Sequence, residues 1–398
     1  MEHFLNLNYI QAINNLEIME ERQDDVDTIR FHVAENPFAI LTERAFVKKF
    51  RLTKGLVNIL IDELCPYLEP PSRKSAISIE RKVLTALRFF ASGSYQQDIG
   101  ENRASSLSQP SVSKCIAEVC DALNMPNIFS KYVRFPSTLN ELNHIRQGFT
   151  NVFGIPGVIG IIDCTHVVIV PPKADGPYPE HIYVNRKNYH SINVQLICDS
   201  NMRIMNVNAK YPGSTHDSYI WRRSAISTIM EQMNTEGMRS YYLLGRLMTP
   251  LNNPEPNTPE GRYNEWFSKT RSLIERTNGL LKMRFRCLLK HRVLHYHPIK
   301  ASKIINACVI LHNICIENNV PEPVDDIIND VDLGMYYVEE NQLNLQQVNP
   351  TLLAGRRMQH QIINNYFISN IWAVVSLNFS VARAVFVNFD FLPKDLEK

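Results

Sequence analysis

The strongest pattern in the chain is an unbroken apolar run at residues 157–162 that ends in a carboxylate, Asp163. A run of this length is typical of a strand buried on both faces of a sheet. Short apolar runs predict further strands at residues 166–170, 191–198, 202–209 and 241–244. The sequence therefore predicts a central, mostly parallel sheet, with Asp163 at the tip of its first strand and a hairpin turn at Asp199.

Apolar residues at helical spacing predict helices at residues 54–68, 78–91, 108–123, 218–233, 262–289 and 298–316. The third helix follows a polar turn and opens with the sequence SQPSVSK, which ends at Lys114. This arrangement matches a helix-turn-helix, in which the start of the second helix meets base edges. An ordinary helical bundle explains it equally well, because Lys114 is the only cation of that helix and Glu118 and Asp121 lie further along it.

The order of these elements predicts an α/β fold class and five segments. They are a loose helical start at 1–40, a small all-α helix-turn-helix-like domain at 41–135, the α/β domain at 157–315, an acidic linker at 316–350, and a helix with an apolar tail at 351–398.

Charge is unevenly distributed, although the formal net charge of the whole chain is only +2. Residues 262–303 contain 11 Lys and Arg against two acids, whereas residues 317–340 contain 8 Asp and Glu and no Lys or Arg. A compact basic block predicts a surface that binds a polyanion, with an acidic segment able to cover it or compete for it. A solvated helix face explains such a block about as often.

The 8 cysteines have neither Cys-x-x-Cys pairs nor zinc-site spacing, which predicts buried thiols in a reducing compartment. Residues 1–30 are acidic and polar, so no signal peptide is expected. Polar residues interrupt the apolar tail at residues 371–392, so no membrane span is expected there.

The predicted helix at residues 262–289 carries two stripes. The apolar stripe, which should face the core, consists of Ile274, Leu281, Phe285 and Leu288. The second stripe consists of Arg271, Glu275, Lys282 and Arg286. An ion pair between Arg271 and Glu275 on a solvated face, worth less than about 1 kcal/mol, explains this stripe. A metal ligand at Glu275, flanked by cations that hold phosphates, explains it too, and the helix alone does not decide.

Four sequence pieces occur in a fixed order: GIIDCTH at 160–166, NRKNYHS at 185–191, YPGSTHDS at 211–218, and IER followed by GLLKMRF at 274–285. Together with the Leu-His-Asn sequence at 311–313, they resemble the Harbinger transposase-derived nuclease family, of the DDE type. The resemblance covers residues 40–315, with a closing helix near 355–367. It implies a ribonuclease-H-like mixed sheet with flanking helices.

The resemblance also implies a chemistry: hydrolysis of DNA phosphodiesters by two Mg²⁺ or Mn²⁺ ions held between carboxylates, whose hard oxygens suit these ions. Asp163 and Glu275 are similar in position to the catalytic Asp and Glu of the family, and Asp217 to a further metal ligand. Residues expected to hold DNA phosphates are Arg186, Lys187, Arg271, Lys282, Arg286 and, in the helix-turn-helix, Lys114. His166 and His216 are expected mainly to orient the site.

One departure from the family pattern changes this expectation. After the strand at 241–244 the family carries Gly-Asp-Ser-Gly-Tyr, whereas here Gly245 is followed at once by Arg246. The second catalytic Asp is missing and Arg246 would repel a cation, so we expect weak or absent cleavage. A non-catalytic DNA- or protein-binding relative is the alternative. Candidate substitutes for the lost carboxylate are Asp199, Glu255 and Glu260, although Asp199 fits a turn residue.

The resemblance finally implies a Myb/SANT-like protein partner that assists nuclear entry and DNA recognition. It therefore implies a protein of the nucleus and cytoplasm. The apolar tail after Ser369 is unlike the family.

Overall fold

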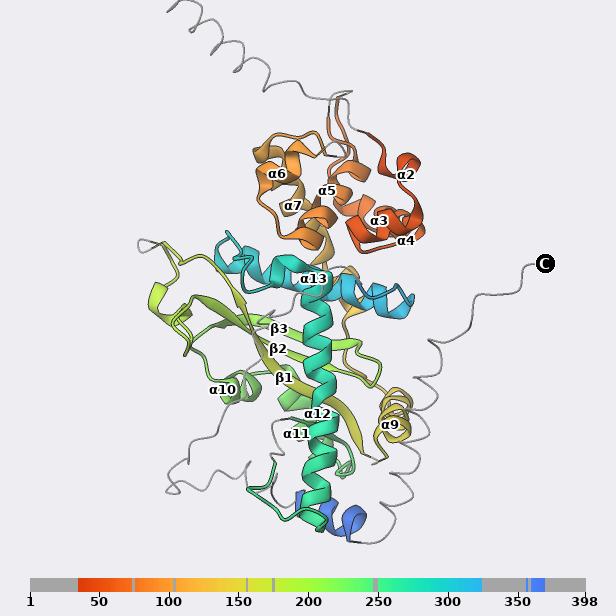
Figure 1. The fold of residues 1–398 in the computed structure, drawn as a ribbon, viewed down its shortest axis with the longest axis vertical. Helices are drawn as coiled ribbons and strands as arrows, with labels where there is room; N and C mark the ends of the chain where they lie inside the picture. The colour runs from red at the N-terminus through yellow and green to blue at the C-terminus, as the bar shows by residue number, and fades with distance from the viewer. Residues whose placement is uncertain are drawn as a thin grey trace, which may run out of the picture.

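The computed structural model describes residues 35–73, 76–102, 105–154, 157–173, 176–245, 250–323, 356 and 359–368 (Figure 1). The predictions for the helical start up to residue 34, for Arg246, for the acidic linker beyond residue 323 and for the apolar tail lie outside these residues. The proposed domain boundaries stay predictions.

A helical region comes first in the described chain. Its helices are α2 (Pro37–Ile40), α3 (Glu43–Phe50), α4 (Lys54–Leu64), α5 (Ile79–Ser92), α6 (Gln96–Glu101), α7 (Gln109–Leu123) and α8 (Pro126–Tyr132). Hydroxyl caps set the starts of three of them, because Thr42, Thr53 and Ser78 each accept a hydrogen bond from the amide three residues on. α5 ends at Gly93, whose φ of +62° favours glycine. A side chain at Gly93 would lie 2.8 Å from the Cα of Cys287, so the glycine permits close packing there.

The central sheet has four strands in the order β3-β2-β1-β4. They are β1 (Val158–Val168), β2 (Ser191–Cys198), β3 (Ile204–Pro212) and β4 (Tyr242–Leu244). The first three form an antiparallel meander, and β4 pairs with β1 in parallel. The mixed α/β fold class is therefore confirmed, whereas the expectation of a mostly parallel sheet is wrong.

β1 continues through Asp163, so the division into strands at 157–162 and 166–170 is also wrong. Asp163 pairs with Leu196 in the middle of an unbroken register that runs from Ile161 to Val168. The polar residues after Ile162 do not end the strand, because β2 supplies hydrogen-bonding partners along this whole length.

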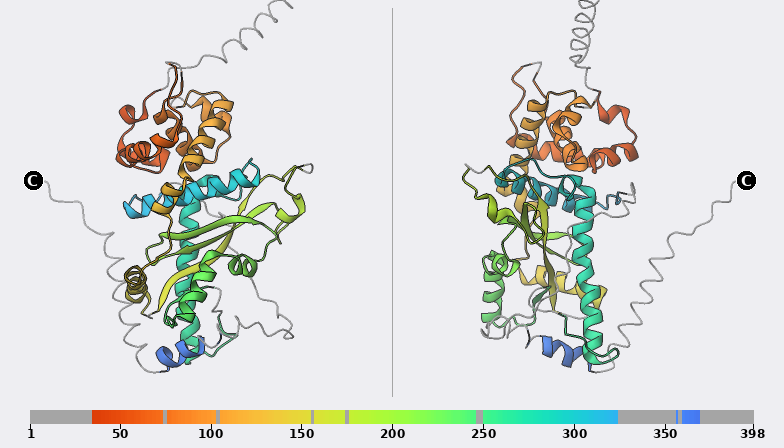
Figure 2. Two further views of the ribbon diagram at one scale, coloured as in Figure 1. Left: turned by 180° about the vertical axis from the view of Figure 1, so that it is seen from behind. Right: turned by 60° about the vertical axis from the view of Figure 1, so that its left-hand side comes forward.

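Helices cover both faces of the sheet (Figure 2). One face packs on α12 (Pro259–Arg284) and α13 (Pro298–Glu317), and the other on α10 (Asp217–Arg222), α11 (Ala225–Thr235) and Leu142 of α9 (Leu139–Phe153). On β1, Ile161 and Val167 belong to the α12 side and Ile162 to the α10 side. Because successive strand residues point to opposite faces, Asp163 shares the α12 side and His166 the α10 side. The predicted helix at 218–233 is thus two helices; Ser224 caps the second.

α12 carries the core stripe that the sequence predicted, and it ends earlier than expected. Ile274, Leu281, Phe285 and Leu288 are each at most 2% exposed. The helix ends at Arg284, and a short 3-10 turn, η3 (Arg286–Leu288), follows it. Near its start, Phe367 of the π-helical turn η4 (Ile363–Phe367) packs on Tyr263 and Trp266, where the family's closing helix was expected.

α13 lies between the sheet and the helical region and contacts both β3 and α7 (Figure 1). It is the one described helix that is long and apolar enough to cross a membrane, but 67% of that stretch is buried inside the protein. It is therefore a core helix of this fold. All 8 cysteines are free thiols, and only Cys65 is exposed.

Candidate functional site

Asp163 lies half-buried on the side of β1 that α12 covers. Burial raises the pKa of its carboxyl to about 6. The nearby cation of Arg271 opposes this rise, whereas Asp217 and Glu275 add to it. The fold therefore brings Asp217 of α10 and Glu275 of α12 close enough to the carboxyl of Asp163 to raise its pKa.

Glu275 shares a cation with Asp163. The Nε atom of Arg271 lies 3.6 Å from Oε1 of Glu275, one helical turn away, and the two side chains are 33% and 26% exposed. The ion pair expected on this stripe is present. Because Arg271 also acts on Asp163, one guanidinium partly neutralises two of the three carboxylates.

Asp217 is the first residue of α10, and the sheet holds its side chain in place. Nδ2 of Asn193, a buried residue of β2, donates to Oδ1 of Asp217 at 2.8 Å and to the carbonyl of Thr215 at 2.9 Å. Sequence reasoning missed Asn193. The available signal was an amide within a strand that is otherwise largely apolar, since a buried amide requires a partner.

Two more amides lie on this side of the sheet. Gln195 of β2 is fully buried, and its backbone lies opposite Cys164 of β1 and Asn208 of β3. Both polar atoms of the Gln195 side chain, and Oδ1 of Asn208, are buried without a hydrogen-bond partner among the described residues. The part of this face near α10 is therefore polar, whereas the part beneath α11 on the same face is apolar.

The loop that carries Arg186 and Lys187 is shaped by Asn185. Oδ1 of Asn185 accepts a hydrogen bond from the amide of Lys187 at 2.9 Å, and Asn188 takes a left-handed conformation with φ of 58°. Arg186 and Lys187 are exposed, and the Arg186 guanidinium contacts the ring of His216 at 3.0 Å from Nδ1. Asn185 thus holds the loop in shape and Arg186 ties it to His216, while the side chains of both cations stay exposed to solvent.

His166 lies on the α10 side of β1, close to these cations. Its Nδ1 lies 3.0 Å from the hydroxyl of Ser191. Burial lowers the pKa of His166 to about 4, Asp217 opposes the change, and Lys282, Arg186 and Lys187 reinforce it. The ring is therefore neutral at physiological pH, as suits a group that orients its neighbours.

Lys282 is placed differently from the expected surface position. It is 1% exposed, and its ammonium donates to the hydroxyl of Thr165 at 2.7 Å and to the carbonyl of His166 at 3.0 Å. These contacts tie α12 to β1. A lysine buried in this way is a structural link and not a surface contact for phosphate.

The other two predicted DNA contacts lie away from the carboxylates. Lys114 is 65% exposed on α7, but Glu69 and Glu118 each lie 3.5 Å from its ammonium and raise its pKa. Arg286 is half-buried in η3, close to Arg88 of α5. The structure therefore places Arg271 and Glu275 beside Asp163 on the α12 side, and Arg186 and Lys187 near His166 on the α10 side, where Asp217 also lies. Lys114 and Arg286 lie outside both groups.

The end of β4 lies against the residue that precedes Asp163. Leu244 pairs with Ile161, and Gly245 follows with φ of +119°. A side chain on Gly245 would lie 2.1 Å from the carbonyl oxygen of Ile162, so only glycine fits. Gly245 is the residue after which the family pattern described above carries an Asp.

The remaining residues do not fit a two-metal site. Among the residues that the structure describes, no group of three or more His, Cys, Asp or Glu side chains is placed to hold a metal ion. Asp217 and Glu275 both lie near Asp163, but the three carboxylates do not form such a group. Glu275 is already paired with the guanidinium of Arg271. The chemistry of the donors suits Mg²⁺ or Mn²⁺, but their number and placement do not.

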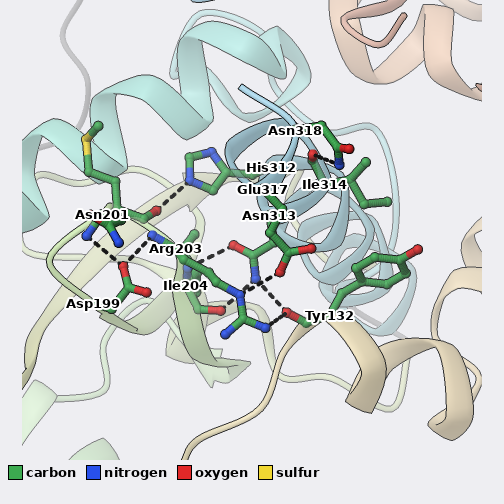
Figure 3. Close-up of polar contacts among 11 residues, drawn as sticks. Tyr132, Asp199, Asn201, Arg203, Ile204, His312, Asn313, Ile314, Glu317 and Asn318 are labelled. Carbon is green, nitrogen blue, oxygen red and sulfur yellow. Dashed lines mark hydrogen bonds and ion pairs between the residues drawn. The ribbon is translucent and has the colours of Figure 1, made fainter. Parts of the chain in front are cut away.

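None of the three acids considered as replacements for the missing carboxylate is placed beside Asp163. Oδ1 of Asp199 accepts hydrogen bonds from the amides of Asn201 at 2.8 Å and Arg203 at 2.9 Å, so Asp199 is the turn residue that was predicted (Figure 3). Glu260 lies in the first turn of α12, about 22 Å along the helix axis from Glu275 at 1.5 Å per residue. Glu255 precedes that helix and lies beside Gly261.

The Leu-His-Asn sequence has a structural role that sequence reasoning did not assign. Asn313 of α13 accepts a hydrogen bond from the amide of Ile204 at 2.8 Å and donates to the carbonyls of Ile204 at 2.7 Å and Tyr132 at 2.8 Å (Figure 3). His312 is hydrogen-bonded through Nε2 to the carbonyl of Met202 at 2.9 Å. These bonds attach the β2–β3 hairpin to α13.

Residues 162–313 match the family model described as DDE superfamily endonuclease. The chain is 38% identical over 288 residues to "Putative nuclease HARBI1" of Homo sapiens, which covers 70% of this chain and 80% of the relative. It is 31% identical over 334 residues to the protein of the same name from Xenopus laevis, covering 82% and 91%. "Protein ALP1-like" of Arabidopsis thaliana is 25% identical over 264 residues, covering 62% of this chain and 63% of that protein.

No solved structure matches the chain. The relatives extend over most of the chain, and the family match spans the sheet together with α12 and α13. This chain therefore belongs to the Harbinger transposase-derived nucleases of the DDE superfamily.

Proposed function

We propose that this chain is a DNA-directed protein of transposase descent whose cleavage of phosphodiesters is weak or absent. The observation that carries the proposal is the passage from Gly245 directly to Arg246, at a strand end that lies beside Asp163. The family's second Asp is missing where it would complete the set. The alternative is a member of the family that binds DNA or protein and has no catalytic role.

In two-metal nucleases the divalent ions supply an activated water and stabilise the leaving oxygen. The described residues do not fit such a site, which is why we expect little or no hydrolysis by this chain. Asp163, with a pKa of about 6, is mainly ionised at pH 7 and is balanced by the guanidinium of Arg271. In this proposal Arg271 takes part of the neutralising role that an ion has in an active relative.

The residues proposed to hold DNA backbone phosphates at this site are Arg186 and Lys187. Both are exposed on a loop that Asn185 keeps in shape, and both lie near His166 and Asp217. Arg271 is one-third exposed and lies beside Asp163 and Glu275, on the α12 side of the sheet. Such contacts position DNA without reading its sequence, so binding here is expected to be non-specific and sensitive to salt.

A metal-dependent nicking assay on supercoiled DNA tests the proposal. We expect no clear turnover by the wild type in Mg²⁺ or Mn²⁺ at ordinary enzyme concentrations, because one central carboxylate is missing. Arg246→Asp restores a carboxylate at that sequence position and is expected to gain nicking in Mn²⁺. The matched control, Arg246→Asp combined with Asp163→Asn, should lose that gain. Clear turnover by the wild type would contradict the proposal.

A protein partner of the Myb/SANT type is proposed to supply sequence recognition, and location in the nucleus and cytoplasm is proposed with it. The charge of the candidate recognition helix supports such a partner. Lys114 is its one cation, and Glu69 and Glu118 already pair with that cation. Affinity purification of the full chain from nuclear extract should recover a Myb/SANT-like protein. Recovery of histones alone would count against the partner, and fluorescence of a tagged chain checks the location.

A further inference from the structure

The helical region packs against the chain that follows α12, and we call this interface the seam. Aromatic contacts between residues 89–95 and residues 295–296 stabilise it. Phe89 of α5 meets the ring of Tyr296 edge-on, with ring centroids 5.8 Å apart, and Gln96 donates to the Tyr296 hydroxyl at 2.8 Å. Tyr95 packs beside His295 at 5.8 Å and remains 68% exposed. The two halves of the seam therefore have a defined relative position.

At this seam α5 packs on both α3 and η3, and a side chain at Gly93 would lie 3.1 Å from the carbonyl carbon of Arg286. Basic side chains from both halves lie here: Lys49 of α3, Arg88 of α5, Arg286 of η3, and His291 and Arg292 of the loop that follows. We call these five residues the seam cluster. Lys49 and Arg88 lie close enough for Arg88 to lower the pKa of Lys49, after the larger effect of burial. Arg286 acts in the same way on Arg88 and on His291.

The seam cluster is a costly arrangement for the protein alone. Partial burial and like-charge repulsion both disfavour the charged forms of Arg88 and Lys49. For Lys49, the carboxylate of Glu35 and a hydrogen bond to Oδ1 of Asn102 at 3.0 Å offset part of this cost. Within the described part of the chain, Arg88 forms no ion pair with a carboxylate, and Nε of Arg292 is buried without a hydrogen-bond partner. Such a concentration of positive charge is favourable once an anion lies among the side chains.

A chain of contacts leads from the candidate site to the seam cluster. The ring of His166 lies 6.5 Å from that of Tyr189, and the ammonium of Lys290 lies over Tyr189, 5.3 Å from its centroid. Lys290 precedes His291 in sequence. From Glu275 to the end of α12 at Arg284 the helix axis rises about 14 Å, which corresponds to about four base pairs of B-form DNA.

We propose that the seam cluster binds the phosphate backbone of the same DNA that occupies the candidate site, across the junction with the helical region. This inference rests on the proposed DNA binding and adds to it a second contact region. It also gives the helical region a role that does not depend on Lys114. The exposed ring of Tyr95 lies at the edge of this path, where an aromatic face beside cations suits contact with nucleic acid.

Fluorescence anisotropy of a labelled 20-base-pair duplex, titrated with the full chain at several salt concentrations, tests the inference. Arg88→Gln and Lys49→Gln should each weaken binding roughly tenfold and reduce the slope of log K against log salt by about one. Lys48→Gln is the matched control, because Lys48 is exposed, lies on the same helix and has the same charge. It should change affinity much less.

The melting temperature, measured with and without duplex, distinguishes a loss of DNA binding from a loss of folding. Arg88→Gln is expected to raise the Tm of the free protein, because it removes a repulsive charge, and to reduce the gain in Tm that duplex gives the wild type. If Arg88→Gln and Lys49→Gln bind duplex like Lys48→Gln with an unchanged salt slope, the seam inference is wrong and the proposed function stands. If the wild type does not bind duplex, both are wrong.

Discussion

At the scale of single residues, removal from water decides which groups of this protein carry charge. Asp163 on β1 and His166 three residues later have pKa values of about 6 and about 4, and burial is the main cause of both. The two shifts bring each group toward its neutral form. At pH 7 the imidazole of His166 is therefore neutral, whereas the carboxylate of Asp163 is mainly ionised and lies beside the cation of Arg271.

His312 gives a prediction about pH at this scale. It is fully buried, and burial lowers its pKa to about 4. Because an unfolded histidine has a pKa of about 6.5, the unfolded chain binds the proton first as pH falls. Stability from His312 is therefore full above pH 6.5 and declines toward pH 4, by about 3 kcal/mol at most.

Denaturant unfolding of the wild type and His312→Gln between pH 7 and pH 4 measures this effect. Glutamine can still donate to the carbonyl of Met202 but does not titrate in this range. We expect the difference in unfolding free energy between the two proteins to shrink as pH falls. A difference that stays constant over that range would show that His312 is not kept neutral by the fold.

At the scale of elements, one amide of α13 bonds to both the sheet and the helical region. Asn313 makes three hydrogen bonds to backbone groups of Ile204 and Tyr132, all of them buried. Removing the amide leaves those groups unsatisfied, so Asn313→Ala should cost about 3 kcal/mol or more of unfolding free energy. Asn318→Ala is the matched control near the end of the same helix, where the amide makes one bond to Ile314.

Chemical denaturation of both variants measures the comparison. The control should lose less than about 1 kcal/mol, since one local bond at a helix end is involved. Equal losses in the two variants would contradict the assigned link between α13 and β3. A fall in stability confined to Asn313→Ala would explain why the Leu-His-Asn sequence accompanies this fold.

Elements whose pattern is local could be predicted from the sequence. The hairpin at Asp199 follows from its own turn chemistry, and the core stripe of α12 follows from the spacing of Ile274 and Leu281. The course of β1 could not be predicted, because the polar residues from Asp163 onward resemble a turn until β2 pairs with them. Lys282 fits a cationic stripe by spacing, and only the contact of α12 with β1 shows that it is buried.

At the scale of the whole molecule, the sheet and α12 bring together acids that are more than fifty residues apart in sequence. The family resemblance identified Asp163, Asp217 and Glu275, and the fold places them as neighbours. It could not reveal Asn193, which holds Asp217, or the seam cluster, whose members come from α3, α5 and residues 286–292. Contacts between distant elements leave no periodic signal in a single sequence.

The central claim is that the carboxylates left in this chain do not make a working divalent-metal site. Isothermal titration calorimetry with Mn²⁺, comparing the wild type with Asp163→Asn, tests it most directly. We expect equal heats for the two proteins, because Asp163 has too few partners to bind an ion tightly. Saturable binding by the wild type that disappears in Asp163→Asn would contradict the account.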